Sequence, residues 1–239
     1  MAVPFIELNN GRTIPAIGFG TFQSKPEEAV DAVCYALKEA GYRHIDCAWV
    51  YGNEASVGKG IEASGVPRSE IFITSKVWGT YHSRVEESLN QTLANLGTDY
   101  LDLYLMHWPV PLNPKGNHPS FPTLPDGKRD VDHAWDIRDT WKQMEGLVKK
   151  GKVKTIGVSN CSQTKLEHLL ETAEIVPAVN QVRLRVCVCV CVCVCMRACM
   201  QFFFLSLDLG YAIPGGEREE RHLNPLSSPP LFIFIVFRD

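Results

Sequence analysis

Four side chains that could carry out acid/base chemistry lie near the ends of three successive apolar segments. Asp46 and Tyr51 flank the end of the second predicted strand, residues 44–48. Lys76 ends the third strand and His107 ends the fourth. Taken singly, a Tyr or His of this kind is usually a satisfied core residue, and a Lys after a strand is usually solvated. Burying an acid, an amine and an imidazole together costs several kcal/mol unless they pair, so their joint placement indicates a functional site.

The segments that must position these groups alternate between short apolar runs and helix-like stretches. A β-hairpin is predicted at the start, because Asn10–Gly11 supplies residues that tolerate the positive φ of a tight turn. Six strands are predicted after it, at Ile17–Thr21, His44–Ala48, Ile71–Val77, Tyr100–Trp108, Val153–Asn160 and Ala178–Gln181.

Helices are indicated between these strands by start and stop signals. Ser24 with Glu27, and Ser83 with Glu86, have the spacing of a capping box. Gly41 and Gly97 are expected to close the two helices that these pairs would begin. Two later helices are predicted over about 132–150 and 162–173.

Regular alternation of strand and helix predicts right-handed βα units and a parallel sheet. Both a doubly wound sheet and a (β/α)₈ barrel satisfy this pattern. The barrel is favoured because no G-x-G-x-x-G follows the first strand. It is also favoured because polar residues gather at the carboxyl ends of the strands, where barrel active sites form. The stretch 109–130, which carries Pro and Gly, is predicted to be a loop over that face.

Composition limits the classes of function. The 239 residues carry 24 Lys and Arg against 27 Asp and Glu, and this near-neutral balance argues against nucleic acid or an anionic membrane as the main partner. The longest apolar stretches fall short of the ~20 residues that span a bilayer, and the first residues lack a basic signal-peptide region. We therefore expect a soluble, cytoplasmic protein, monomeric if folded, with Cys34, Cys47 and Cys161 as reduced thiols.

Five motifs in order resemble the aldo-keto reductase family over residues about 5 to 181. They are HIDCAWVYGNE (44–54), FITSKVW (72–78), LDLYLMHWP (101–109), GKVKTIGVSN (151–160) and PAVNQ (177–181). The resemblance implies a (β/α)₈ barrel that transfers hydride from a nicotinamide cofactor, usually NADPH, to an aldehyde or ketone. The family's catalytic tetrad maps onto Asp46, Tyr51, Lys76 and His107. Within the family, the chain looks most like reductases of small polyols and aldehydes, including glycerol dehydrogenase-type members.

Roles for the four residues are set by the charge that hydride addition leaves on oxygen. Tyr51 is expected to be the general acid, with its pKa lowered by the Lys76 ammonium. Asp46 would hold Lys76 charged and in place. His107 would hydrogen-bond the carbonyl oxygen.

The resemblance also implies contacts with the cofactor and the substrate. Asp46 belongs to both the catalytic set and the cofactor-binding set. The other residues expected to contact the cofactor are Gly20, Thr21, Phe22, Ser159, Asn160 and Gln181. The residues expected to line the substrate pocket, for a small carbonyl compound or polyol, are Trp49, Trp78, His107 and Trp108. No metal site is expected in this part of the chain.

After Gln181 the resemblance stops, and the family's last two strands are not recognisable. We therefore divide the chain into a partial barrel, 1–181, truncated after about six strands, and a tail, 182–239. The Val–Cys alternation that begins at Val186 is what a repeated GT dinucleotide encodes, so we interpret the tail as translated intron or a frameshift product. Two alternatives remain for the whole chain: a non-catalytic barrel fragment that binds partners, and a metal binder that uses the cysteine series Cys187–Cys199.

Overall fold

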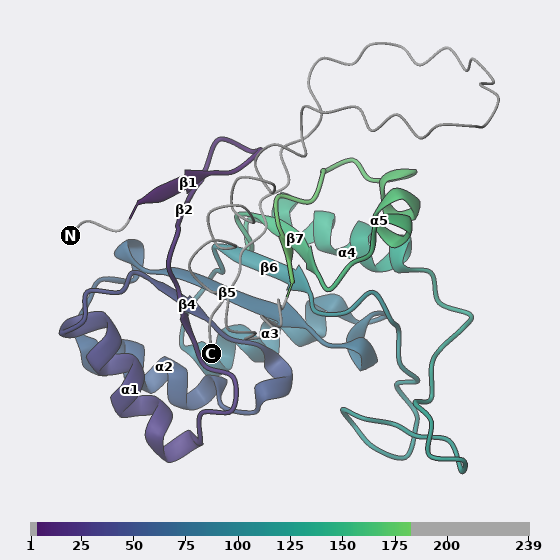
Figure 1. Ribbon diagram of the computed structural model, residues 1–239, viewed down its shortest axis with the longest axis horizontal. Helices are drawn as coiled ribbons and strands as arrows, with labels where there is room; N and C mark the ends of the chain where they lie inside the picture. The colour runs from purple at the N-terminus through teal and green to yellow at the C-terminus, as the bar shows by residue number, and fades with distance from the viewer. Residues whose placement is uncertain (1–3, 183–239) are drawn as a thin grey trace, which may run out of the picture. The chain divides into compact units, whose positions relative to one another are not determined.

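The computed structural model describes residues 4–182. Their architecture is a two-stranded antiparallel hairpin followed by a curled parallel sheet of six strands (Figure 1). The hairpin strands are β1 (Phe5–Glu7) and β2 (Thr13–Pro15). The sheet strands, which pair in chain order, are β3 (Phe19–Gly20), β4 (His44–Asp46), β5 (Phe72–Val77), β6 (Leu103–Met106), β7 (Ile156–Ser159) and β8 (Asn180–Gln181).

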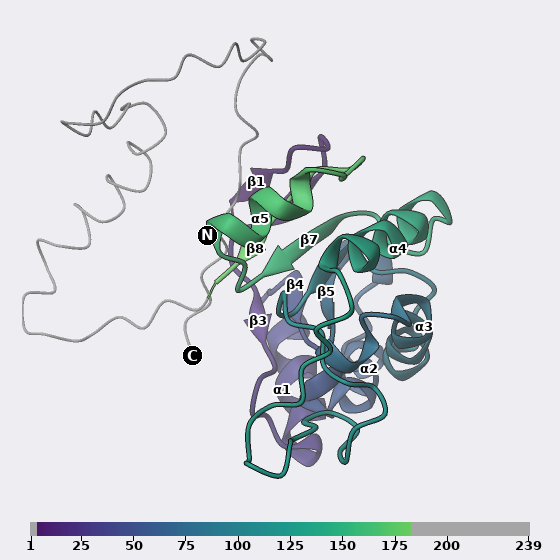
Figure 2. The same ribbon diagram turned by 90° about the vertical axis from the view of Figure 1, so that its right-hand side faces the viewer.

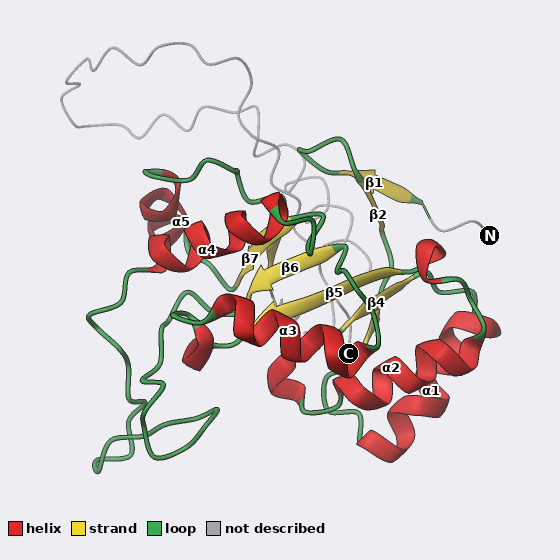
Figure 3. Ribbon diagram, turned by 180° about the vertical axis from the view of Figure 1, so that it is seen from behind, coloured by secondary structure: helices red, strands yellow, loops and turns green. Residues whose placement is uncertain are grey.

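Five α-helices connect these strands. They are α1 (Pro26–Lys38), α2 (Glu54–Ser64), α3 (Val85–Leu96), α4 (Ile137–Lys149) and α5 (Gln163–Leu170). Three short 3₁₀ turns are η1 (Trp49–Tyr51), η2 (Arg68–Glu70) and η3 (Gly79–Tyr81). Figure 3 shows α3 and α4 lying across the same face of the sheet. Each predicted strand contains an observed one, and the part of a (β/α)₈ barrel expected from the sequence is confirmed over the described residues.

Both faces of the sheet are buried, as parallel strands require. Alternate residues of β6 illustrate this, because Tyr104 and Met106 belong to the core beneath the helices while Leu103 and Leu105 point to the other face. On that inner face, Leu8 and Ile14 of the hairpin pack against Leu103 and Leu105. The hairpin therefore closes the interior of the curled sheet.

The hairpin lies at one end of the sheet, away from α1 and α2, in both views of Figures 1 and 2. Its turn is held there by two side-chain amides. Asn9 donates to the Pro177 carbonyl at 3.2 Å, and Asn10 donates to the Thr155 hydroxyl at 3.0 Å. Thr155 and Pro177 precede strands β7 and β8, so the hairpin covers the amino ends of the strands.

Two predicted helix starts are wrong. Lys25 precedes α1 and Arg84 precedes α3, and neither helix has a side-chain cap, so the capping boxes at Ser24 and Ser83 do not form. Pro26 begins α1 instead, because its restricted φ suits the first helical position. By contrast, Gly97 follows α3 at φ 66° as expected.

The two later helices are shorter than predicted, α4 mainly at its start and α5 mainly at its end. Asp136 caps α4 by accepting from the Arg138 backbone N–H, so this helix begins at Ile137 rather than near residue 132. Ser162 caps α5 by accepting from the Lys165 N–H, and the helix ends at Leu170.

Within residues 4–182, no helix is long and apolar enough to cross a bilayer. The Val–Cys alternation and the cysteine series lie outside the described range, and so does the tail apart from its first residue, Val182.

We predict that α2 and α3 approach too closely to tolerate a methyl group at Gly58. A Cβ there would lie 2.7 Å from the Asn95 carbonyl oxygen and 2.9 Å from Leu96 backbone atoms. Gly58→Ala should therefore lower the free energy of unfolding by about 1–3 kcal/mol in urea titrations. Gly146→Ala is the matched control, because no atom lies within 4 Å of its Cβ position in α4. That control should gain about 0.5–1 kcal/mol from helix propensity, and equal effects at both sites would contradict the packing argument.

Candidate active site

The centre of the site is an ion pair between neighbouring strands. Lys76 Nζ lies 2.8 Å from Asp46 Oδ1 and 2.9 Å from Oδ2, and it also donates to the Cys47 carbonyl at 2.9 Å. Lys76 is 1% exposed and Asp46 6% exposed, so the pair is almost dry. The pair forms because β4 and β5 are parallel neighbours. Asp46 pairs with Thr74, two residues before Lys76, so both side chains lie near the carboxyl edge of the sheet.

Tyr51 approaches this pair from the turn η1. Its hydroxyl oxygen lies 3.5 Å from Lys76 Nζ. The phenol ring packs at 5.0 Å from Phe22 and at 5.7 Å from His107, measured between ring centroids. His107 follows β6, and its backbone N–H donates to the Val77 carbonyl at the end of β5. The structure thus brings together the four residues that the sequence predicted as a catalytic set.

Burial changes the expected acidity of the phenol. It raises the pKa of Tyr51, and the Lys76 ammonium acts in the opposite direction without reversing the shift. The sequence-based expectation of a lowered pKa is therefore wrong for the protein alone. Tyr51 keeps its proton at neutral pH, and the ammonium beside it is placed to stabilise phenolate once the proton leaves.

The two basic groups shift in opposite directions. Burial by itself lowers the pKa of Lys76, but Asp46 and Tyr51 outweigh it and the net shift is upward, so the amine stays charged. Burial together with the Lys76 charge takes the pKa of His107 well below its usual value. His107 is consequently neutral near pH 7, and its buried Nδ1 has no hydrogen-bond partner among the described residues.

The residues predicted to contact a cofactor form two groups at this edge of the sheet. Thr21 is buried, and its hydroxyl donates to the Asp46 carbonyl at 3.1 Å. Gly20 before it has open space where a Cβ would stand, and Phe22 after it is half-exposed against Tyr51.

The second group lies at the ends of β7 and β8. The Ser159 hydroxyl donates to the Gln181 carbonyl at 2.8 Å. The Asn160 amide donates to the His107 carbonyl at 3.1 Å, from a backbone with φ 54°. The Gln181 amide donates to Asp46 Oδ1 at 3.3 Å, which links this group to the ion pair.

The predicted pocket tryptophans have different surroundings. Trp78 packs edge-on against His107 at 5.2 Å, and Trp108 is 46% exposed. Trp49 packs at 4.8 Å from Tyr81 and donates to Gln91 of α3 at 2.9 Å, so its ring is tied to the helix layer. Its place in the substrate pocket stays a prediction.

An aromatic residue of the long loop also belongs to this region, although the sequence did not single it out. Phe121 packs at 5.3 Å from Trp78, which itself packs on His107. The loop is held there because Trp78 Nε1 donates to the Ser120 carbonyl and the Thr80 hydroxyl donates to the Pro119 carbonyl at 2.9 Å. The available signal was an aromatic residue close to prolines, in a loop predicted to cover the strand ends.

Two buried polar residues directly after the tyrosine turn were not predicted either. Asn53 donates to the Thr21 and Ser24 carbonyls at 2.8 and 2.9 Å. Glu54 is 2% exposed and accepts from the Ser75 hydroxyl at 2.7 Å; burial raises its pKa. Asn53 therefore ties the turn that carries Tyr51 to the segment that follows β3, and Glu54 ties it to Ser75, the residue before Lys76.

Among residues 4–182 no group of three or more His, Cys, Asp or Glu side chains could hold a metal ion. The four convergent side chains can instead donate, accept and stabilise a proton beside an aromatic wall. An arrangement of this kind suits chemistry at a polar bond of a small molecule.

Comparison with known proteins agrees with this chemistry. Residues 16–190 match the model described as "Aldo/keto reductase family". The chain is 54% identical over 187 residues to a D-galacturonate reductase of Hypocrea jecorina, an alignment that covers 76% of this chain and 60% of that protein. It is 50% identical over 186 residues to the glycerol 2-dehydrogenase (NADP(+)) of Saccharomyces cerevisiae, covering 75% of this chain and 59% of that protein.

A solved aldose reductase from Schistosoma japonicum superposes with a TM-score of 0.71 at 45% identity, over 76% of this chain and 61% of that one. The chain therefore spans about 60% of the length of the relatives it matches.

We predict that removing one member of the buried ion pair is strongly destabilising. Asp46→Asn leaves Lys76 charged and without its carboxylate partner, so the free energy of unfolding should fall by about 3–5 kcal/mol in urea titrations. Adding Lys76→Met should recover part of that loss. Glu174→Gln is the control, because its pair with Lys149 is exposed and its loss should be small. If Asp46→Asn lowered the free energy of unfolding no more than the control does, the pair would not be shielded from water as we describe.

Buried neutral histidines predict a loss of stability in mild acid. Burial lowers the pKa of His44 and of His82 to about 4. Below pH 6.5 the unfolded chain therefore binds protons that the folded chain does not, and the free energy of unfolding falls as the pH drops toward 4. His82→Gln should reduce the loss between pH 7 and pH 5 by about 2 kcal/mol, measured by urea unfolding at each pH. The exposed His133, replaced in the same way, is the control and should leave that loss unchanged.

Proposed function

Because the chain belongs to the aldo/keto reductase family, we propose that it reduces the carbonyl group of a small aldehyde or ketone to an alcohol, with a nicotinamide cofactor as hydride donor. The observation that carries the proposal is the convergence of Tyr51, Lys76, Asp46 and His107 at one edge of the sheet. The names of the relatives support the same reaction class, since they include an aldehyde reductase and a glycerol 2-dehydrogenase.

Tyr51 supplies the proton in this reaction. Hydride addition to a carbonyl leaves negative charge on oxygen, and a donor placed there stabilises that charge as it develops. The raised pKa keeps Tyr51 protonated before the reaction. Lys76, 3.5 Å from the hydroxyl, stabilises the phenolate that proton transfer leaves behind. Asp46 keeps Lys76 charged and directed toward the phenol.

His107 acts as a neutral hydrogen-bond donor. Its lowered pKa leaves an imidazole that carries one proton, and a neutral ring can orient a carbonyl oxygen without competing with Tyr51 as an acid. Trp78 packs against this ring edge-on and limits its rotation. The Asn160 amide holds the His107 carbonyl, so the backbone at the end of β6 is also held.

The proposed cofactor is NADPH, which supplies the hydride when it is bound. The residues present fit its nicotinamide carboxamide, because Asn160 Oδ1 and Gln181 Oε1 accept no hydrogen bond from the described residues while their amide groups are engaged. The Ser159 hydroxyl lies beside them. Open space at Gly20 would let the backbone approach the nucleotide. The choice of NADPH over NADH is taken from the relative named for NADP(+).

The proposed substrate is a small carbonyl compound or the corresponding polyol. Trp78, Phe121 and the half-exposed Trp108 provide apolar walls beside Tyr51 and His107. A pocket with aromatic walls and few polar groups orients a short substrate by its carbonyl oxygen. The D-galacturonate reductase and the glycerol 2-dehydrogenase are both named for small polyhydroxylated compounds.

The test is the reduction of glyceraldehyde by the full chain with NADPH, followed by loss of absorbance of the reduced cofactor. Tyr51→Phe should lower kcat by roughly 10²–10⁴-fold because the proton donor is gone. The dissociation constant for NADPH, measured by quenching of its fluorescence, should change by less than about threefold. Tyr35→Phe is the matched control, since Tyr35 is 64% exposed on α1 and should retain full activity.

Two outcomes would contradict the proposed function. One is reduction by Tyr51→Phe at the rate of the unaltered chain. The other is an unaltered chain that is folded by circular dichroism but neither binds NADPH nor reduces the aldehyde.

A further inference from the structure

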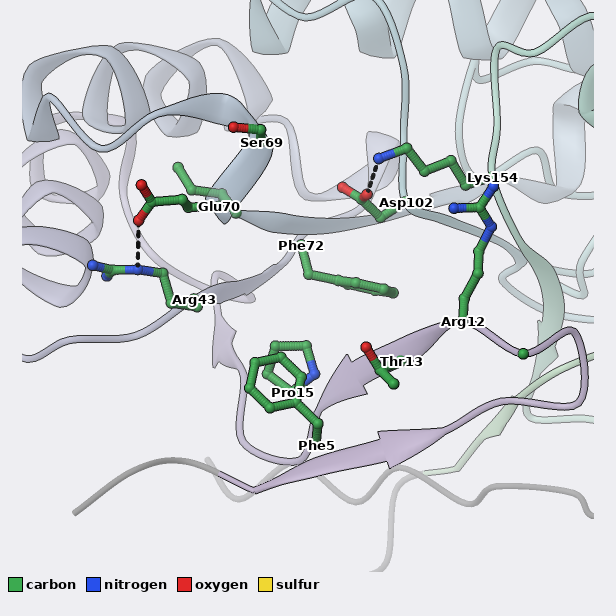
Figure 4. A pocket seen from close by; sticks show the side chains of 12 residues that line it. Phe5, Arg12, Thr13, Pro15, Arg43, Ser69, Glu70, Phe72, Asp102 and Lys154 are labelled. Atoms are coloured by element: carbon green, nitrogen blue, oxygen red, sulfur yellow. Dashed lines mark hydrogen bonds and ion pairs between the residues drawn. The ribbon is translucent and has the colours of Figure 1, made fainter.

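A cavity of about 440 Å³ lies between the β1–β2 hairpin and the sheet, at the opposite end of the strands from Tyr51 and Lys76 (Figure 4). Phe72, the first residue of β5, lines it, whereas Lys76 lies near the end of the same strand. Its size is within the range of small-molecule sites, roughly 300–1,000 Å³. Leu8 and Ile14 fill the interior of the curled sheet between the amino ends and the carboxyl ends of the strands. This cavity is therefore not part of the proposed reaction site.

The cavity has an excess of positive charge. Its lining includes Arg12, Arg43 and Lys154 against Glu70 and Asp102. Both acids are already paired. Glu70 lies 3.7 Å from Arg43, and Asp102 is shared between Lys154 at 2.9 Å and Arg68 at 2.8 Å.

Arg12 differs from the other cations of the cavity. Its guanidinium makes no ion pair or hydrogen bond with any residue in the range 4–182, and it is exposed at the end of the hairpin turn. Figure 4 shows the side chain of Arg12 extending past the hairpin toward Lys154. A guanidinium with free donors beside an ammonium already used by Asp102 is suited to a carboxylate from outside the chain.

The centre of the cavity is apolar and flat. In Figure 4 the Phe72 ring lies between the side that carries Arg12 and the side that carries Arg43, with Pro15 and Phe5 beneath it. The Phe72 ring is held edge-on against His44 at 5.0 Å, and Phe5 is 63% exposed at the rim. Phe72 is only partly buried and lines the cavity, so part of its ring is left for contact with a planar ligand.

We propose that this cavity binds a small aromatic carboxylate, with its ring against Phe72 and its carboxylate on Arg12. A divalent cation does not fit, because both acidic side chains are already neutralised by basic ones. A nucleic acid does not fit either, because the chain carries a net charge of −3 and two of the three cations that line the cavity are already paired with acids. The proposal does not depend on reductase activity.

The probe for the test is 2-naphthoate, titrated into the full chain by isothermal calorimetry at low and high salt. Saturable binding is expected, and it should weaken as salt rises because the contact is charge-assisted. Arg12→Gln should weaken binding about tenfold or more, the loss typical of a hydrogen bond to a charged group. Lys59→Gln, on the exposed face of α2, removes the same charge elsewhere and should leave the affinity unchanged. The neutral analogue 2-naphthalenemethanol should bind at least about fivefold more weakly.

Three results would overturn the proposal: no saturable binding up to millimolar concentration, equal affinity in Arg12→Gln and Lys59→Gln, or binding that is lost in Trp78→Ala and kept in Arg12→Gln. The last would place the naphthoate at the other end of the sheet. Circular dichroism of Arg12→Gln checks its fold, and Phe5→Ser is a second variant that removes apolar surface from the rim. Phe5→Ser should weaken binding about threefold if the ring lies where we propose.

Discussion

The arrangement of the whole site depends on one buried ion pair, Lys76 with Asp46. A dry ammonium is tolerated only when its hydrogen-bonding capacity is filled, and two carboxylate oxygens and the Cys47 carbonyl fill it. The pair also decides the electrostatics around it. Burial lowers the pKa of His107 and the ammonium lowers it further, while the same ammonium opposes the rise in the pKa of Tyr51 that burial causes.

The phenol and the amine are positioned by the helix layer as well as by the sheet. Tyr51 lies on a short turn outside the strands, so its position depends on the two residues at the start of α2. Asn53 ties that turn to the segment that follows β3, and Glu54 accepts a hydrogen bond from Ser75, the neighbour of Lys76. Ser75 and Lys76 are consecutive residues of β5, so their side chains point to opposite faces of the sheet. The Ser75–Glu54 hydrogen bond on the helix side therefore also helps to fix the backbone that orients Lys76 on the inner side.

The two ends of the sheet differ in chemistry. At the carboxyl end, strand termini deliver polar side chains into one region, and the loop with Phe121 adds an aromatic wall. At the amino end, the hairpin closes the interior with Leu8 and Ile14 and leaves a cationic cavity beside Phe72. A parallel sheet produces this asymmetry directly, because all of its strands begin at one edge and end at the other.

The sequence alone determined the six parallel strands, the barrel class and the set of Asp46, Tyr51, Lys76 and His107, because apolar periodicity and polar residues at strand ends are local signals. Only the tertiary structure decided which local signals prevail. Ser24 and Ser83 had the spacing of capping boxes, yet neither serine caps a helix. Helix α1 begins at Pro26 and α3 at Val85, and Lys25 and Arg84 precede them. The direction of the Tyr51 pKa shift depends on how much water the assembled core excludes. The roles of Asn53, Glu54 and Phe121 depend on partners 21 or more residues away, and no pattern within one segment reveals such contacts.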